Sequence, residues 1–236
     1  MQHQQQNRKR TVVIIPAFNE ENSIGLVLND IPADLVDEVV VVDNASTDAT
    51  ANRVRAAGAT LLYESRKGYG SACLKGLEYA LSKGYDIFLF LDADYSDHPE
   101  EAERIIRPIL EDGYDMVIGS RAIGAREAGA MLPQARFGNW LATRLIRLFW
   151  GYRYTDLGPF RGITAEALRK IEMEDTNYGW TVEMQIKAAR LKLKTTEVPV
   201  SYRKRIGTSK ISGTLSGTIK AGWKILYTIA KYSLSK

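Results

Sequence analysis

The chain has 236 residues, of which 45% are hydrophobic and 25% charged, an ordinary globular composition. A chain of this length buries roughly 70% of its unfolded surface, so a full core needs no disulfides. The lone Cys73 excludes an internal disulfide framework and indicates a reducing compartment. The polar start, MQHQQQNRKR, has no secretory signal, and no run approaches the ~20 apolar residues of a membrane span. These features predict a cytoplasmic protein that is soluble or peripheral at the cytoplasmic face of a membrane.

Short apolar runs alternate with helical patterns through the first half of the chain. The expected strands cover residues 11–15, 38–42, 60–63, 87–91 and 116–118. The expected helices cover residues 24–31, 46–57, 71–83 and 100–110. Strands that alternate with helices of this length indicate βαβ units. The sequence therefore predicts a Rossmann-like α/β fold with a mostly parallel central sheet.

The regular alternation stops after Gly119. The second half is expected to hold helices at 139–150 and 182–191, a Gly-rich segment at 158–162, and a strand at 195–200. No Pro/Ser-rich linker or internal repeat separates the halves. We therefore expect one domain over residues 11–212, preceded by a flexible basic tail (1–10) and followed by a C-terminal helix (213–236).

Acidic side chains follow three of the expected strands. Glu20 comes after the first, Asp43 after the second, and Asp92 and Asp94 directly after the fourth. In an open α/β sheet, ligands bind beyond the carboxyl ends of the strands. Two carboxylates beside a buried strand cost free energy unless a cation or hydrogen bonds compensate them. Their hard oxygens suit Mg²⁺ or Mn²⁺, with diphosphate and water completing the coordination, although an isolated Asp-X-Asp could equally cap the helix that follows.

Five segments occur in order at a familiar spacing. They are Ile15-Pro-Ala-Phe-Asn-Glu-Glu21, Val42-Asp-Asn-Ala-Ser-Thr-Asp48, Gly68-Tyr-Gly-Ser-Ala72, Leu91-Asp-Ala-Asp-Tyr-Ser-Asp-His-Pro-Glu100 and Gly119-Ser-Arg121. Together they resemble the inverting family-2 glycosyltransferases of the glycosyltransferase-A fold, and more narrowly the dolichyl-phosphate mannose/glucose synthase branch. The resemblance covers residues 11 to 225. It implies a metal-dependent transfer of a hexose from a nucleotide sugar, of the GDP-mannose or UDP-glucose type, to a polyprenyl phosphate.

The resemblance also implies residue roles. Nucleotide-binding positions are matched by Pro16, Ala17, Glu20, Asp43 and Asp92, with Lys67 reaching the donor. Asp94 matches the metal ligand, assisted by Asp92. The acceptor-binding positions are matched by Ser120, Arg121 and Arg136. The guanidinium groups of the two arginines suit a phosphate, which they can bind through two parallel hydrogen bonds.

Three later segments extend the resemblance. Asp156-Leu-Gly-Pro-Phe-Arg-Gly162 departs from the branch by having Gly158-Pro159 where Ser-Gly is expected, and Arg161 could equally be structural. Trp180-Thr-Val-Glu-Met-Gln185 resembles the segment that closes the acceptor side, and Glu183 is its candidate site residue. Residues 203–210 resemble a mobile basic loop, in which Arg205 and Lys210 are expected to stabilise the leaving nucleoside diphosphate.

The acceptor class can be narrowed by the scarcity of bases. The only histidines are His3, in the tail, and His98. A hydroxyl acceptor usually needs a carboxylate base, whereas a phosphate with a second pKa near ~6 is already ionised. Several unpaired arginines and no obvious base favour a phosphate acceptor. Under the alternative, a family-2 enzyme that acts on a hydroxyl of a soluble or polymer acceptor, Glu183 or Asp156 would serve as the base.

The C-terminal helix is expected to be amphipathic. An apolar face carries residues 215, 219, 222, 223, 226, 229 and 230, and the lysines at 220, 224 and 231 lie opposite. The helix either lies in a membrane interface, as a peripheral contact or against a membrane-protein partner, or packs on the domain. The pI near 9.0 alone does not indicate nucleic acid, since no recognition motif accompanies it.

Overall fold

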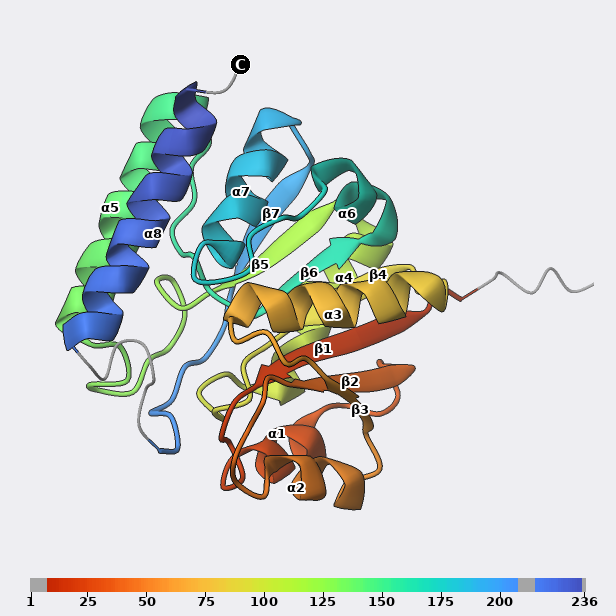
Figure 1. The fold of residues 1–236 in the computed structure, drawn as a ribbon. Coiled ribbons are helices and arrows are strands. Elements are labelled where there is room, and N and C mark those ends of the chain that lie inside the picture. The colour runs from red at the N-terminus through yellow and green to blue at the C-terminus, as the bar shows by residue number, and fades with distance from the viewer. Residues whose placement is uncertain (1–7, 208–214, 235–236) are drawn as a thin grey trace, which may run out of the picture.

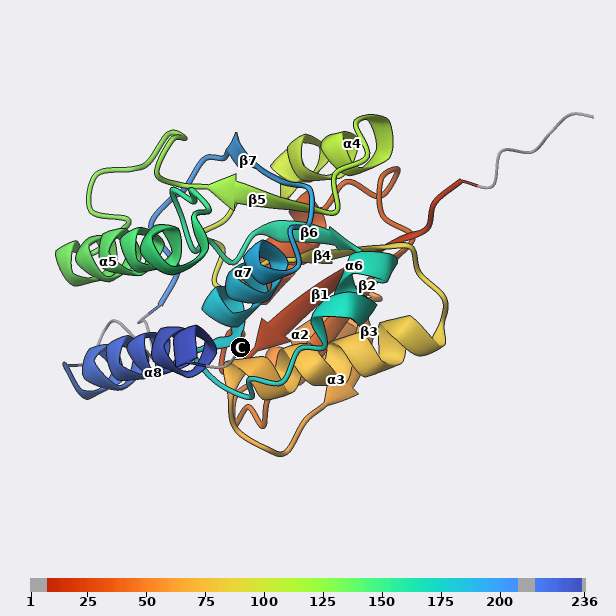
Figure 2. The same ribbon diagram turned by 90° about the horizontal axis from the view of Figure 1, so that it is seen from above.

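The computed structural model describes residues 8–207 and 215–234. One seven-stranded sheet lies between two layers of helices (Figures 1 and 2). The strand order is β3-β2-β1-β4-β6-β5-β7, and β6 runs antiparallel to both of its neighbours while the other pairs are parallel. The predicted α/β fold with a mostly parallel sheet is confirmed.

The elements have the following bounds. The strands are β1 (Thr11–Ala17), β2 (Glu38–Asp43), β3 (Thr60–Tyr63), β4 (Ile87–Phe90), β5 (Met116–Ser120), β6 (Arg161–Thr164) and β7 (Thr195–Pro199). The helices are α1 (Ile24–Asp30), α2 (Thr50–Ala56), α3 (Tyr69–Ser82), the 3₁₀ turn η1 (Pro99–Glu101), α4 (Ala102–Glu111), α5 (Pro133–Trp150), α6 (Ala165–Ile171), α7 (Trp180–Arg190) and α8 (Leu215–Leu234). The expected elements are all present; α5 begins six residues before its expected start, and the other bounds agree within four residues. Two short ones, β6 and α6, were not predicted.

The sheet is buried on both faces, which explains the continuous apolar runs of its central strands. Side chains of a strand alternate between faces. In β1, Val12 and Ile14 therefore join the core beneath α3, α5, α6, α7 and α8, while Val13 and Ile15 join the core beneath α1, α2 and α4. The two cores hold the carboxyl ends of the strands at one common edge.

Strand order places the candidate ligands at that edge. β1 lies between β2 and β4. After β1 the chain continues to β2 and β3 on one side of it, and then crosses to β4 on the other side. A crevice forms at such a switch point. Ala17 is in register with Asp43, and Ile14 with Phe90, so the end of β1 lies beside the start of the Asp92–Asp94 turn.

The chain ends contact the domain where they are described. Within the predicted tail, Arg8 pairs with Asp37 at 3.4 Å, and the Arg10 guanidinium donates to the carbonyl of Lys83. Residues 8–10 are thus held by the domain. Residues 1–7 lie outside the described part of the chain.

Helix α8 lies beside α5 and also contacts α7 (Figures 1 and 2). It turns Thr228, Ile229 and Tyr232 inward, and it leaves Ile219 and Trp223 exposed. Of the residues predicted to share the apolar face, Ile229 packs inward, whereas Ile219, Trp223, Leu226 and Ala230 are exposed. Across the described residues, we find no helix with both the length and the apolar character to span a bilayer.

Candidate active site

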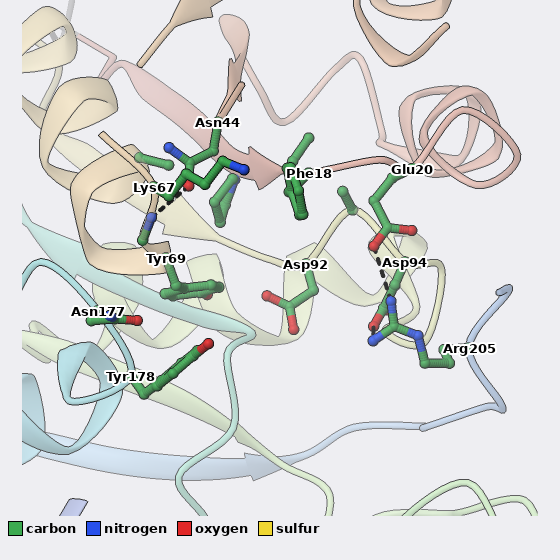
Figure 3. Close-up of a pocket in the computed structure, with 15 residues that line it drawn as sticks. Phe18, Glu20, Asn44, Lys67, Tyr69, Asp92, Asp94, Asn177, Tyr178 and Arg205 are labelled. Atoms are coloured by element: carbon green, nitrogen blue, oxygen red, sulfur yellow. Dashed lines mark hydrogen bonds and ion pairs between the residues drawn. The ribbon is translucent and has the colours of Figure 1, made fainter. Parts of the chain in front are cut away.

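A cavity of about 360 Å³ opens at the carboxyl ends of β1 and β4. Its walls come from the end of β1, the start of α3, the turn after β4, the loop at 174–178 and the segment at 203–207 (Figure 3). Seven of the site residues predicted from the sequence line it. They are Pro16, Ala17, Glu20, Lys67, Asp92, Asp94 and Arg205.

The Gly68-Tyr-Gly70 turn brings one wall of the cavity into place. Gly68 has φ +151°, and a Cβ there would lie 2.2 Å from the carbonyl oxygen of Thr176. A Cβ on Gly70 would lie 2.0 Å from the carbonyl oxygen of Asp175. Only glycine allows this approach. The 174–178 loop can therefore seat on the first turn of α3, with the Ser71 N–H donating to the Thr176 carbonyl at 2.9 Å.

Three carboxylates gather in the turn after β4. Burial and the neighbouring Asp94 raise the pKa of Asp92 to about 7, and burial raises the pKa of Asp97 well above its usual range. One carboxylate oxygen of Asp92, Oδ1, is buried and has no hydrogen-bond partner among the described residues. Asp94 Oδ1 accepts from the Ser96 N–H at 2.9 Å. The cluster concentrates negative charge that a cation would compensate.

Arg205 already supplies one such cation. Its guanidinium bridges Glu20 (Nη2–Oε1, 2.9 Å) and Asp94 (Nη1–Oδ2, 3.0 Å), as Figure 3 shows. The Ile206 N–H donates to the Asp94 carbonyl at 3.0 Å, and the Arg203 guanidinium lies 3.4 Å from the centre of the Tyr95 ring. The basic segment expected to be mobile is thus docked over the acids as far as residue 207. Lys210 lies outside the described residues.

A second cavity, of about 250 Å³, adjoins the first and shares Asp94 and Arg205 with it. Its remaining polar lining comes from Arg121, Tyr202 and Lys204. The rest of its lining is apolar and runs from the 129–132 loop into the first turn of α5 at Ala135. The cavity therefore combines cationic and apolar side chains, with the Lys204 side chain close to Gly129.

Arg121 is held by a buried partner. Its Nε and Nη2 atoms donate to both carboxylate oxygens of Asp156 at 2.8 Å, and its backbone N–H donates to Asp156 Oδ2 at 2.7 Å. Asp156 is fully buried, and the Tyr202 ring centre lies 4.9 Å from the guanidinium carbon. The expectation of unpaired arginines was wrong for Arg121 and Arg205, because both are in ion pairs. The ion pair with Asp156 fixes the Arg121 guanidinium at the wall of the second cavity.

Replacing Asp156 with Ala is expected to destabilise the fold by about 3–5 kcal/mol, because it leaves the Arg121 charge largely buried without its partner. For a domain of this size, that lowers the melting temperature by on the order of 10 °C. Differential scanning calorimetry measures the shift. Arg136→Ala, which removes an exposed guanidinium on α5, is the matched control and should change stability by less than about 0.5 kcal/mol. Equal melting temperatures for Asp156→Ala and the wild type would contradict the assigned role of this pair.

Comparison with known proteins agrees with this geometry. The model of glycosyl transferase family 2 matches residues 12–172. The chain belongs to glycosyl transferase family 2. It is 34% identical to an undecaprenyl-phosphate mannosyltransferase of Micrococcus luteus, over 88% of this chain and 90% of that protein. It is 29% identical to a UDP-N-acetylglucosamine–dolichyl-phosphate N-acetylglucosaminyltransferase of Methanococcus voltae, over 97% and 98% of the two chains.

The fold of this glycosyltransferase is also found in a solved structure. Glucosyl-3-phosphoglycerate synthase from Mycobacterium tuberculosis, in complex with Mn²⁺, UDP and glucosyl-3-phosphoglycerate, superposes with a TM-score of 0.76. The match covers 96% of this chain and 80% of that chain at 24% identity. It establishes a shared glycosyltransferase-A fold.

Four predicted residues of the glycosyltransferase do not line either cavity. Asp43 accepts from the Ser46 N–H at 3.0 Å, and its neighbour Asn44 lines the first cavity instead. Ser120 is buried, with its hydroxyl 2.6 Å from that of Thr155. Arg136 is exposed on α5. The fourth is Glu183. The structure therefore places the seven lining residues and Arg121 at the two adjoining cavities, and leaves these four outside them.

Glu183 instead ties the 174–178 loop to the C-terminal helix. It is buried, accepts from the Asp175 N–H at 2.8 Å and from the Tyr232 hydroxyl at 2.7 Å, and pairs with Lys187 at 3.0 Å. Lys224 of α8 pairs with Asp175 at 2.8 Å. The lysine face predicted for α8 is thus partly engaged by the domain. Glu183 acts on the first cavity through the loop that forms its wall.

Sequence reasoning missed several lining residues as site candidates. Asn177 and Tyr178 form the wall opposite β1, and Phe18, Asn44 and Tyr69 complete the pocket (Figure 3). Asn44 donates to the carbonyls of Glu64 and Arg66 and accepts from the Gly68 N–H, so it positions the turn before α3. Asn44 directly follows Asp43 at the end of β2, so the rule that ligands bind at the carboxyl ends of strands could have predicted it. Asn177 and Tyr178 do not follow a strand, so that rule could not predict them.

Proposed function

We propose that this glycosyltransferase moves a hexose from a nucleotide sugar to a polyprenyl phosphate, with inversion at the anomeric carbon. The observation that carries the proposal is that the two cavities share Asp94 and Arg205. The larger cavity has the size and polar lining for a nucleotide sugar. The smaller combines fixed cations with an apolar wall, which matches a phosphate attached to a lipid. The names of the two relatives support this acceptor.

The residues of the first cavity fit a divalent cation, Mg²⁺ or Mn²⁺, at Asp94 with Asp92 assisting. Asp92 has an unpartnered buried oxygen, and Asp94 Oδ2 already faces a cationic group. Over the part of the chain that is described, no cluster of three or more His, Cys, Asp or Glu side chains could hold a metal ion. Donor phosphate oxygens and water would therefore complete the coordination. When bound, the cation would neutralise the diphosphate; the solved neighbour with Mn²⁺ and UDP supports this.

The chain's own residues provide positioning and charge. Arg121 and Lys204 would hold the acceptor phosphate at the wall of the second cavity. A phosphate oxygen then attacks the anomeric carbon, a new C–O bond forms, and the bond from that carbon to the donor diphosphate breaks. Arg205 would move from its bridge between Glu20 and Asp94 to the departing diphosphate, with Lys210 completing the charge.

A phosphate acceptor requires no base, and in the described part of the chain neither carboxylate named for the hydroxyl alternative lines either of the two cavities. Asp156 is fully buried in its pair with Arg121, and Glu183 is buried behind the 174–178 loop. The hydroxyl alternative needs one of them within hydrogen-bond distance of the attacking oxygen. A lipid phosphate acceptor would also place the reaction at the cytoplasmic face of a membrane.

A transfer assay with matched acceptors tests the proposal. The purified chain is incubated with GDP-mannose or UDP-glucose, Mn²⁺ or Mg²⁺, and either a short polyprenyl phosphate or the corresponding polyprenol. With the polyprenyl phosphate we expect metal-dependent product. With the polyprenol we expect a reaction at least about 10²-fold slower, because no base is positioned to deprotonate its hydroxyl. Donor hydrolysis with no lipid product, or preference for the alcohol, would contradict the acceptor assignment. Glu183→Gln, assayed with both acceptors, separates the alternatives: as a residue that positions the loop it should affect both reactions alike, whereas as the base it would abolish only transfer to a hydroxyl.

A further inference from the structure

Helices α5 and α8 form one continuous edge of the molecule (Figures 1 and 2). They contact each other, and α7 packs against both. Neither helix contains an aspartate or a glutamate, and together they carry six basic residues. These are Arg136, Arg144, Arg147, Lys220, Lys224 and Lys231.

The outward side of this pair is unusually apolar. Nine of the fifteen large hydrophobic side chains exposed in the described part of the chain lie on these two helices. Trp140 is 51% exposed and Leu148 74% on α5; Ile219 is 62% and Trp223 71% exposed on α8. Exposed apolar groups gathered in this way mark an interaction surface. We call these four residues, with the basic residues around them, the α5–α8 face.

Charge decides which partner fits the α5–α8 face. Lys224 and Lys231 are paired with Asp175 and Glu174, which leaves Arg136, Arg144, Arg147 and Lys220 as the excess positive charge of the face. A second copy would bring two such positive surfaces together, since a two-fold interface opposes the same patch to itself. An anionic lipid surface offers the complementary charge. Tryptophan favours the headgroup region of a bilayer, where its apolar ring and polar N–H are both accommodated. Basic residues beside it are attracted to anionic headgroups.

The α5–α8 face also meets the second cavity. The apolar wall of that cavity includes Leu132 and Ala135, which lead into α5, and Trp140 follows on the same helix. Arg121 and Lys204 line the same cavity. An amphiphile whose chain lies along α5 would therefore place its phosphate beside these cations.

We propose that the α5–α8 face docks on an anionic lipid bilayer and presents the second cavity to lipids in it. The docking itself is independent of catalysis. The delivery of the acceptor from the bilayer rests on the proposed function.

Vesicle co-sedimentation tests the docking with the full chain. We expect binding to phosphatidylcholine vesicles that contain phosphatidylglycerol, weakened by salt, and little binding to pure phosphatidylcholine. The variant Trp140→Ser/Trp223→Ser should bind at least about tenfold more weakly. Tyr63→Ser/Leu191→Ser, which removes two hydrophobic side chains exposed elsewhere, is the matched control and should bind like the wild type. Equal binding by both variants would overturn the proposal, as would a wild-type dimer in size-exclusion chromatography that the tryptophan variant abolishes.

A second readout separates this inference from the proposed function. With a water-soluble short-chain polyprenyl phosphate, the tryptophan variant should match the wild type in transfer rate. With a long-chain acceptor embedded in anionic vesicles, it should be about tenfold slower. If the wild type uses neither acceptor, the proposed function fails while the vesicle binding still decides the docking. Equal rates of the two proteins on embedded acceptor would contradict delivery from the bilayer.

Discussion

Replacing Asp94 with Asn is expected to lower kcat/KM for sugar transfer by about 10³-fold, equivalent to roughly 4 kcal/mol of transition-state stabilisation. The carboxylate oxygen Oδ2 faces the cavity and contacts Arg205 at 3.0 Å, whereas Oδ1 accepts from the Ser96 N–H. Asparagine keeps an acceptor for Ser96 and loses the charge that would bind a divalent cation. The turn should therefore stay folded while its chemistry is lost.

Steady-state kinetics at several Mn²⁺ concentrations measures this effect. Asp34→Asn makes the same chemical change at an exposed position on the loop before β2, and it should retain wild-type kinetics. A melting temperature within a few degrees of the wild type excludes misfolding as the cause. If Asp94→Asn stays within tenfold of the wild type at saturating Mn²⁺, Asp94 is not the essential metal ligand.

The donor half of the fold could be predicted because local rules determine it. Apolar β-branched runs mark the parallel strands, and side chains that follow such strands meet at one edge of the sheet. This is why Glu20, Asp92 and Asp94 were expected at one edge of the sheet, where all three line the first cavity; Asp43, expected there by the same rule, does not line it. The resemblance to family 2 added Pro16, Ala17 and Arg205, which also line the first cavity.

The parts of the second half that escaped prediction are those that depend on long-range contacts. β6 is only four residues long and begins with Arg161, whose guanidinium is buried and donates to the carbonyls of Gly158, Leu157 and Thr181. Nothing local distinguishes such a strand from a Gly-rich loop. The partners of Arg121 and Arg205 lie 35 and 185 residues away in Asp156 and Glu20, so these arginines appeared unpaired.

Helix α8 shows a related limit. Its apolar periodicity predicted a helix, which the structure has, but left open whether the apolar face packs on the domain or faces outward. The inward stripe is set by packing against α5 and α7, by the ion pair of Lys224 with Asp175, and by the hydrogen bond from Tyr232 to Glu183 of α7. Helical periodicity describes one helix, whereas burial depends on what that helix meets.

Removal of the Arg205 side chain is expected to have two opposite effects. In Arg205→Ala, kcat/KM should fall by about 10²–10³-fold, because one preorganised donor to the departing diphosphate is lost. Mn²⁺ binding in the absence of donor should instead become about tenfold tighter, a gain of roughly 1.4 kcal/mol. The reason is that the guanidinium and the cation compete for the same Asp94 oxygen.

Isothermal titration with Mn²⁺ and steady-state kinetics measure the two effects separately, and their opposite signs make the test specific. A merely structural role for Arg205 would weaken both metal binding and turnover. Arg205→Lys keeps a charge but lacks the fork that spans Glu20 and Asp94, so it should fall between the wild type and Arg205→Ala in both measurements. Arg126→Ala, at an exposed position outside both cavities, should change neither. Unchanged Mn²⁺ affinity in Arg205→Ala would show that the ion pair does not oppose cation binding; Arg205 would then have to be displaced by the donor, and not by the metal.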